Sequence, residues 1–176
     1  MIETHPFEVF IPENARYLIL GSFIGKQAIR GTADYDASYD FYYGTKRNQF
    51  WPILEAVYGQ ALRIKPDKLA LLGKLGIAIG DIIYQCERMG GNNLDANLKI
   101  IRYNEEPINK VLADNKIESV FFTSRNVEHK FKMAFRQTIR LYPLMNLICL
   151  PSPSPRYARM TKEQKIDRYK ALLPEL

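Results

Sequence analysis

Two polar segments of the chain combine the residue types that a binding or catalytic site uses. Residues 21–25 read Gly-Ser-Phe-Ile-Gly and open a long loop, rich in aromatic and charged residues, that runs to Trp51. Residues 151–158 read Pro-Ser-Pro-Ser-Pro-Arg-Tyr-Ala. Each segment directly follows a short apolar run of strand type, and loops that follow parallel strands meet at one edge of their sheet. The sequence therefore predicts that the two segments share one cleft.

The elements that must position these segments alternate between strand and helix along the chain. Strands are expected at 16–20, 76–83, 118–123 and 146–150, and helices at 48–58, 66–75, 104–115, 127–139 and 161–173. This alternation predicts an α/β fold with a central parallel sheet of about four strands. Residues 85–97 are polar, with a loop expected at Gly90-Gly91-Asn92-Asn93 and a helix cap at Asp95, and Thr161 is not expected to open a full capping box.

Four loops are expected at the carboxyl edge of this sheet, namely residues 21–25, 80–81, 123–126 and 152–157. Asp81 is the acid that directly follows an inner strand, which makes it a candidate for the site. The spacing of the first loop fits neither a Walker loop nor a dinucleotide fingerprint, so a phosphate cradle is not predicted there.

Composition limits the classes of protein to consider. The chain has 176 residues, of which 47% are hydrophobic and 25% charged, as in one ordinary globular domain. No apolar run reaches the ~20 residues of a membrane helix, and the first residues lack the character of a signal peptide, so a cytoplasmic location is expected. With Cys86, Cys149, His5 and His129 as the full set of cysteines and histidines, no metal and no cofactor is expected.

The charge of the chain is compatible with an anionic partner. The net charge is +6 and the isoelectric point is near 9.3. Nucleic acid is a common partner of such a protein, but a role in solubility alone explains the charge equally well.

Taken in order, these segments resemble the uracil-DNA glycosylase superfamily, most closely its mismatch-specific and hypoxanthine-type branch. The resemblance covers most of the chain and rests on motifs that occur in the right order and spacing. They are residues 21–25, Tyr42-Tyr43, Asn48-Gln49-Phe50-Trp51, Gly76-Ile77-Ala78 followed by Asp81, Cys86 and Arg88, and Ser152-Pro153-Ser154-Pro155. The resemblance implies a three-layer α/β/α sandwich and a monofunctional, metal-independent enzyme that removes a damaged base from DNA.

The resemblance also implies roles within the cleft. In this branch the attacking water is assigned to the asparagine of the N-x-F-W segment, here Asn48, and the alternative is that Asn48 only caps the helix that begins there. Ser22 is expected to donate a hydrogen bond to the leaving base. Phe23 is expected to stack on the flipped base, with core packing as the alternative. Tyr43 and Asp81 complete the expected base-binding set, and for Asp81 the roles of catalytic base and helix cap stay open.

The expected partner is DNA that contains damaged or mismatched bases, bound by a monomer. Two hydroxyls and four cations are expected to hold its phosphates: Ser152, Ser154, Arg156, Lys46, Arg47 and Arg125.

Two positions depart from the superfamily pattern. Many members carry Asp or Asn where Phe23 stands, and a histidine often stands in the place of Leu150. The first departure leaves open a carboxylate catalyst among Asp34, Asp36 and Asp40, or a noncatalytic nucleic-acid or nucleobase binder on the same fold; the second lowers the expected uracil activity. A different α/β hydrolase is the remaining alternative. No lysine is expected to be buried beside the cleft loops, so abasic-site lyase activity is not predicted; Lys26 and Lys46 are the lysines to test for it.

Overall fold

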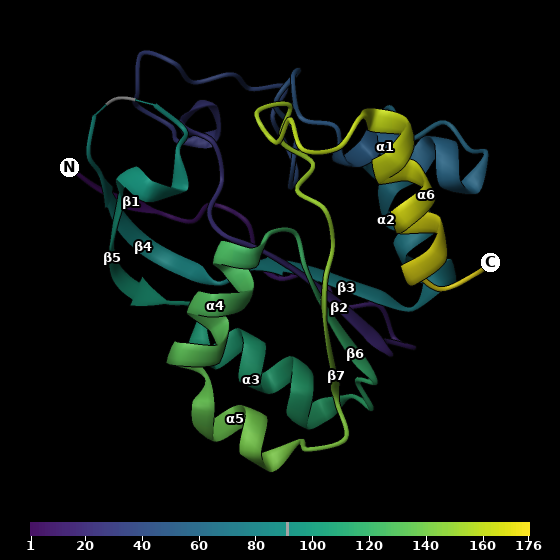
Figure 1. Cartoon of the computed structure of the whole chain (residues 1–176). Helices are drawn as coiled ribbons and strands as arrows, with labels where there is room; N and C mark the ends of the chain where they lie inside the picture. The colour runs from purple at the N-terminus through teal and green to yellow at the C-terminus, as the bar shows by residue number, and fades with distance from the viewer. Residues whose placement is uncertain (91) are drawn as a thin grey trace.

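The centre of the molecule is a sheet of four parallel strands (Figure 1). The computed structural model describes residues 1–90 and 92–176. The sheet has the order β3-β2-β6-β7, and its strands are β2 (Tyr17–Gly21), β3 (Ile77–Asp81), β6 (Ser119–Phe122) and β7 (Asn146–Cys149). All three neighbouring pairs are parallel. The predicted α/β class and the parallel sheet of about four strands are confirmed.

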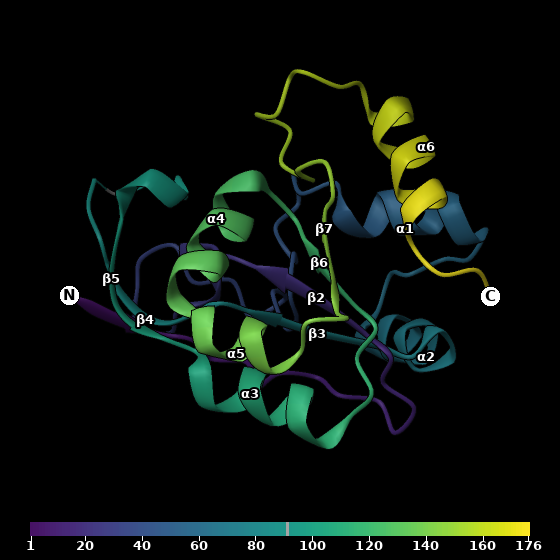
Figure 2. The same cartoon turned by 60° about the horizontal axis from the view of Figure 1, so that its bottom comes forward.

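Helices cover both faces of this sheet (Figures 1 and 2). One face carries α1 (Phe50–Tyr58), α2 (Lys65–Leu75) and α6 (Lys162–Leu172), and the other carries α3 (Glu105–Asp114), α4 (Arg125–Ala134) and α5 (Arg136–Leu141). Because side chains alternate along a strand, Ile19 and Phe121 enter the first core, whereas Leu18 and Leu20 enter the second. The chain therefore forms the expected three-layer α/β/α sandwich.

A second, antiparallel sheet lies beside the first and was not predicted. It has the order β1-β4-β5, with strands β1 (Ile2–Thr4), β4 (Ile83–Arg88) and β5 (Leu98–Tyr103). The polar residues 85–88, which were not predicted to be a strand, lie in β4. Of the loop expected at 90–93, residue 91 lies outside the described residues. The polar side chains of β4 are satisfied by its two neighbours: Gln85 donates to Thr4, Arg88 pairs with Glu3, and Lys99 pairs with Glu87. Because one face of β4 is polar, its sequence lacks the continuous apolar run by which the central strands are recognised.

Several predicted helix boundaries also differ. The helix expected at 127–139 is two helices, because Phe135 between α4 and α5 has φ −105° and ψ 31° and stacks its ring on Phe131, 4.6 Å away. The expectation of no full capping box at α6 is wrong. Thr161 accepts a hydrogen bond from the Gln164 amide, and the Gln164 side chain accepts one from the Thr161 amide, so the third helical residue is Gln164 rather than the glutamate before it.

Asp95 does not cap a helix either, since it is the first residue of the short 3-10 helix η2 (Asp95–Asn97). A second 3-10 turn, η1 (Lys26–Ala28), follows the first cleft loop. Among the described residues, no helix combines the length and apolar character that crossing a membrane requires.

Candidate active site

A cleft of about 910 Å³ opens at the carboxyl edge of the parallel sheet. A volume of this size is in the range of small-molecule sites. All four predicted loops contribute to its lining, which confirms that they converge. Residues 43–48 and the tip of the β4–β5 hairpin with Asn92, Asn93 and Asp95 also join them, as do Lys26, Gln27, Asp36 and Tyr39 from the loop after β2.

The floor of the cleft depends on a glycine at the end of β2. A Cβ atom at Gly21 would overlap the Asp81 carboxylate and the Tyr43 hydroxyl. Tyr43 has φ 57°, an uncommon value for a residue with a side chain, and its ring stacks on Phe50 with centroids 4.2 Å apart. Its hydroxyl lies 3.1 Å from Thr123 Oγ1. Burial, aided by the charge of Asp81, raises the pKa of Tyr43 well above its ordinary value, so the phenol keeps its proton and stays a hydrogen-bond donor.

Asp81 lies in this floor with a partner that sequence reasoning missed. Its Oδ2 is 2.9 Å from Nε2 of His5, and the side chains are 5% and 1% exposed, respectively. The other ring nitrogen of His5 contacts the backbone of Phe7, while the backbone carbonyl of Asp81 accepts a hydrogen bond from Asn104. Asp81 is thus an anchored group that lines the cleft, with one carboxylate oxygen already engaged.

Phe23 lines the cleft and also packs against the protein, so both of its predicted roles have a structural basis. Its ring meets the edge of His5 at 5.5 Å and the guanidinium of Arg88 lies 5.8 Å from its centroid. The side chain is half-buried, and it is a boundary member of the core formed with α3, α4 and α5. The aromatic ring is held in a fixed place beside the space where a flat ligand would lie.

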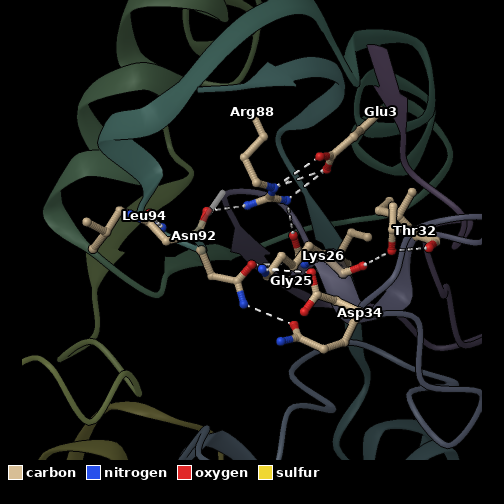
Figure 3. A network of polar contacts seen from close by, with 12 residues as sticks. Glu3, Gly25, Lys26, Thr32, Asp34, Arg88, Asn92 and Leu94 are labelled. Atoms are coloured by element: carbon tan, nitrogen blue, oxygen red, sulfur yellow. Dashed lines mark hydrogen bonds and ion pairs between the residues drawn. The ribbon is translucent and has the colours of Figure 1, made fainter. Parts of the chain in front are cut away.

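A buried arginine fixes the loop that carries Ser22 and Phe23 (Figure 3). Arg88 of β4 binds Glu3 of β1 through two of its nitrogens, and the two side chains are 5% and 10% exposed. The same guanidinium donates to the carbonyl of Ile24 at 3.0 Å and to that of Asn92 at 3.3 Å. One cation therefore ties the antiparallel sheet, the first cleft loop and the hairpin tip together.

Asn48 lies in the cleft lining at the start of α1. Its Oδ1 accepts a hydrogen bond from the Phe50 amide at 2.9 Å, so the side chain does bond to the beginning of the helix, which starts at Phe50 rather than at the predicted residue 48. The amide NH₂ and the second lone pair of Oδ1 are not used by that bond. Asn48 can therefore bond to the start of α1 and still offer its amide to a water molecule in the cleft, so its two predicted roles are compatible.

The second polar segment is tied to the first by backbone and side-chain contacts. The carbonyl of Pro153 accepts a hydrogen bond from the Gln49 amide at 2.9 Å. Ser152 and Ser154 each accept a bond from a backbone amide two residues ahead, which leaves their hydroxyl protons for another acceptor. Both serines and Arg156 line the cleft, as predicted.

Beneath this segment lies a buried lysine that sequence reasoning missed. Lys165 of α6 is 1% exposed, and its Nζ donates to the Gln49 side chain at 2.8 Å and to the Ser154 carbonyl at 3.0 Å. Burial lowers the pKa of Lys165 below its ordinary value. The expectation that no lysine is buried beside the cleft loops is therefore wrong, although Lys165 is not among the residues that line the cleft.

The predicted DNA-binding cations fall into two groups. Lys46, Arg47 and Arg156 are exposed and line the cleft, so they form a cationic rim. Arg125 is exposed on the first turn of α4 and lies outside the lining. Of the three loop aspartates, only Asp36 lines the cleft, and hydrogen bonds from Ser38 lower its pKa.

Asp95 is an acidic residue of the cleft to which sequence reasoning gave no chemical role. Burial raises the pKa of its carboxyl, and the charge of Asp81 adds to this effect, while Lys130 and the nearby Ser22 hydroxyl act in the opposite direction. The hydroxyl of Ser22 is fully buried and makes no hydrogen bond of normal geometry within the described residues.

Across residues 1–90 and 92–176, no group of three or more histidine, cysteine or acidic residues is arranged so that it could hold a metal ion.

Comparison with known proteins supports the fold. No family model matches the chain, and no curated protein does. A solved structure, the solution NMR structure of a protein described as a "putative Uracil DNA glycosylase" from Methanosarcina acetivorans, matches with a TM-score of 0.72 and 22% sequence identity over 98% of this chain and 96% of that chain. The chain therefore has the three-layer α/β/α fold of that protein.

Proposed function

We propose that the chain is a monofunctional DNA glycosylase of base-excision repair that hydrolyses the N-glycosidic bond of a deaminated base, hypoxanthine or uracil, flipped out of DNA. The observation that carries the proposal is the single cleft that gathers an amide, a buried hydroxyl, aromatic rings and a cationic rim at the carboxyl edge of the sheet. The name of the similar solved protein agrees with this class of reaction.

Binding begins at the rim. Lys46, Arg47 and Arg156 supply positive charge where the DNA backbone would approach, and Arg125 extends this charge along α4. Flipping a base costs a few kcal/mol, least for a damaged or mispaired base, and stacking on an aromatic ring offsets about 1–3 kcal/mol of that. In this proposal Phe23 supplies the ring, and Tyr43 and Asp81 line the same cleft.

Hydrolysis then needs a positioned water and a stabilised leaving group. Asn48 is too weak a base to remove a proton near neutral pH, but its amide can orient water against an oxocarbenium-like sugar. The departing base gathers negative charge, and in the proposal the buried Ser22 hydroxyl of the cleft donates a hydrogen bond to it. No described residue accepts a hydrogen bond from the backbone amides of Phe23 or Ile24, so both are available as further donors.

The test is incubation of the purified chain, with EDTA present, on duplexes that carry uracil, hypoxanthine, xanthine or a G·T mismatch, followed by alkaline cleavage at abasic sites. Strand cleavage at hypoxanthine or uracil is the expected result. Absence of cleavage on every duplex, with DNA binding retained, would contradict the proposal and favour a noncatalytic binder of nucleic acid or nucleobases.

A further inference from the structure

Ser22 and Asp95 form an unexplained polar pair in the wall of the cleft. Both residues line the cleft. The Ser22 hydroxyl is fully buried and makes no hydrogen bond of normal geometry with any described residue, which is costly for a polar group unless a ligand completes it. Its contact with the Asp95 carboxyl is close enough to lower the pKa of that carboxyl, as a hydrogen-bond donor does, but it falls short of a formed hydrogen bond. The pair thus presents one donor and one acceptor side by side.

The hairpin tip that carries Asp95 is held against the loop that carries Ser22. Arg88 bonds to Asn92 on the hairpin and to Ile24 on the loop, as Figure 3 shows for its contact with Asn92. Asn93 accepts a hydrogen bond from the Lys26 amide at 2.9 Å and donates one to Gln27 at 3.0 Å. Asp95 is therefore positioned relative to Ser22 by several contacts that do not involve either side chain.

We propose that Ser22 and Asp95 together read the lactam edge that deamination creates, and so make the cleft selective for deaminated bases; this inference rests on the proposed function. A lactam places a carbonyl oxygen next to a ring N–H, as in hypoxanthine and uracil. The Ser22 hydroxyl donates to the oxygen, and the ionised Asp95 carboxylate accepts from the N–H. The departing base becomes negative mainly at its carbonyl oxygen, and this oxygen faces the Ser22 hydroxyl and not the Asp95 carboxylate. The positive charge of Lys130 offsets part of the negative charge of Asp95.

The same pair disfavours the parent bases. Adenine and cytosine place an amino group next to a ring nitrogen that carries a lone pair. The ionised Asp95 carboxylate repels that lone pair, so both the carboxylate and the ring nitrogen stay buried without a hydrogen-bond partner. Binding sites discriminate most strongly against a ligand that leaves buried polar groups unpaired in this way. Asp81 is less suited to this task because one of its oxygens is already bound to His5.

The first test compares Asp95→Asn with the wild-type chain. Asparagine keeps the size of the side chain but presents a donor as well as an acceptor, which fits adenine as well as hypoxanthine. We expect the preference for hypoxanthine over adenine in single turnovers to fall at least about tenfold, because adenine gains a hydrogen-bond partner that Asp95 denies it. Asp114→Asn, an exposed aspartate at the end of α3, is the matched control and should leave this preference unchanged.

The second test removes the lactam from the ligand. A duplex with unsubstituted purine in place of hypoxanthine lacks both the oxygen that Ser22 would contact and the ring N–H that Asp95 would accept from. The wild-type chain should process it more slowly than hypoxanthine. Ser22→Ala should lose the part of this difference that the oxygen causes and keep the part that Asp95 causes. If the Ser22→Ala chain keeps the full difference, or if Asp95→Asn keeps the full preference for hypoxanthine, the inference is wrong.

Two measurements on the wild-type chain alone keep the inference testable if a variant does not fold. Burial raises the pKa of Asp95 above its ordinary value, so the carboxylate becomes protonated at a higher pH than an exposed aspartate does. As the pH is lowered, the preference for hypoxanthine should therefore begin to decline above the pH range in which an exposed aspartate titrates. A preference that stays constant across that range would contradict the inference. Titration with free hypoxanthine and free adenine separates the two proposals: a chain that binds hypoxanthine preferentially but releases no base contradicts the glycosylase and supports the lactam-reading pair, and equal affinity contradicts the pair.

Discussion

Nε2 of His5 lies 2.9 Å from Oδ2 of Asp81, and this buried contact joins the N-terminal segment to the end of an inner strand 76 residues later. The His5 ring also packs on Phe23 and Tyr42, with centroids 5.5 Å away in both cases. A residue that lines the cleft is therefore held by a segment that is remote from it in sequence.

Replacing His5 by Phe should destabilise the protein by about 3 kcal/mol, because the ring packing is retained while a buried carboxylate loses its partner. Urea denaturation followed by fluorescence measures this loss. The double variant that adds Asp81→Asn should be less destabilised than the sum of the single variants, since a neutral amide needs the imidazole less. A loss below about 1 kcal/mol for His5→Phe would show that the contact contributes little.

The parts of the fold that the sequence predicts are those with a local signal. Central strands such as Tyr17–Gly21 are buried on both faces, so they appear as continuous apolar runs ended by glycine or a polar residue. The antiparallel sheet lacks this signal, because Arg88 and Glu87 look like loop residues until Glu3 and Lys99 are placed beside them. Pairing over such a sequence distance cannot be read from periodicity.

In the candidate site, too, the features with a local sequence signal could be predicted and the long-range contacts could not. The convergence of the loops could be predicted, since parallel topology brings strand ends to one edge. The side chains that support those loops could not. Lys165 contacts Gln49 across 116 residues, and Asp95 acquires its raised pKa from burial and charges supplied by other segments. A lone lysine in a polar helix and a lone aspartate in a polar hairpin carry no local sign of burial.

Replacing Asn48 by Ala should preserve DNA binding and lower base release by about 100-fold, because the water loses the group that orients it. The change should also cost about 1 kcal/mol of stability, since the Phe50 amide loses its acceptor. Asn48→Ser separates the two effects: a hydroxyl can still accept from the helix start, so stability should recover while base release stays low. Undiminished single-turnover rates in Asn48→Ala would show that Asn48 only supports the helix.

Replacing Arg156 by Ala should weaken DNA binding without changing which base is preferred, because this exposed rim cation contacts phosphate in the proposal. The slope of log affinity against log salt should become shallower by about 1. Fluorescence anisotropy with a labelled duplex measures the slope. Arg140→Ala, an exposed arginine on α5, serves as the control and should leave it unchanged. Equal slopes for the wild type and Arg156→Ala would remove Arg156 from the DNA-binding surface.

The buried lysine predicts a dependence of stability on alkaline pH. Burial lowers the pKa of Lys165 in the folded chain below the ordinary value of 10.5, so the unfolded chain binds this proton more tightly than the folded chain does. The cost of burying the charge is present in full below the lowered pKa and declines as the pH rises from there toward 10.5. Across that window the wild type should therefore gain stability relative to Lys165→Met.

Denaturation midpoints of both chains at a series of alkaline pH values test this prediction, and taking the difference removes the titration of the buried tyrosines that both chains share. A neutral amine still donates to the Gln49 side chain and the Ser154 carbonyl, so deprotonation keeps the contacts that tie the two cleft loops to α6. Lys162→Met, an exposed lysine at the start of the same helix, should give a flat difference curve. A flat curve for Lys165→Met as well would mean that the lysine is solvated in solution and does not clamp the two loops.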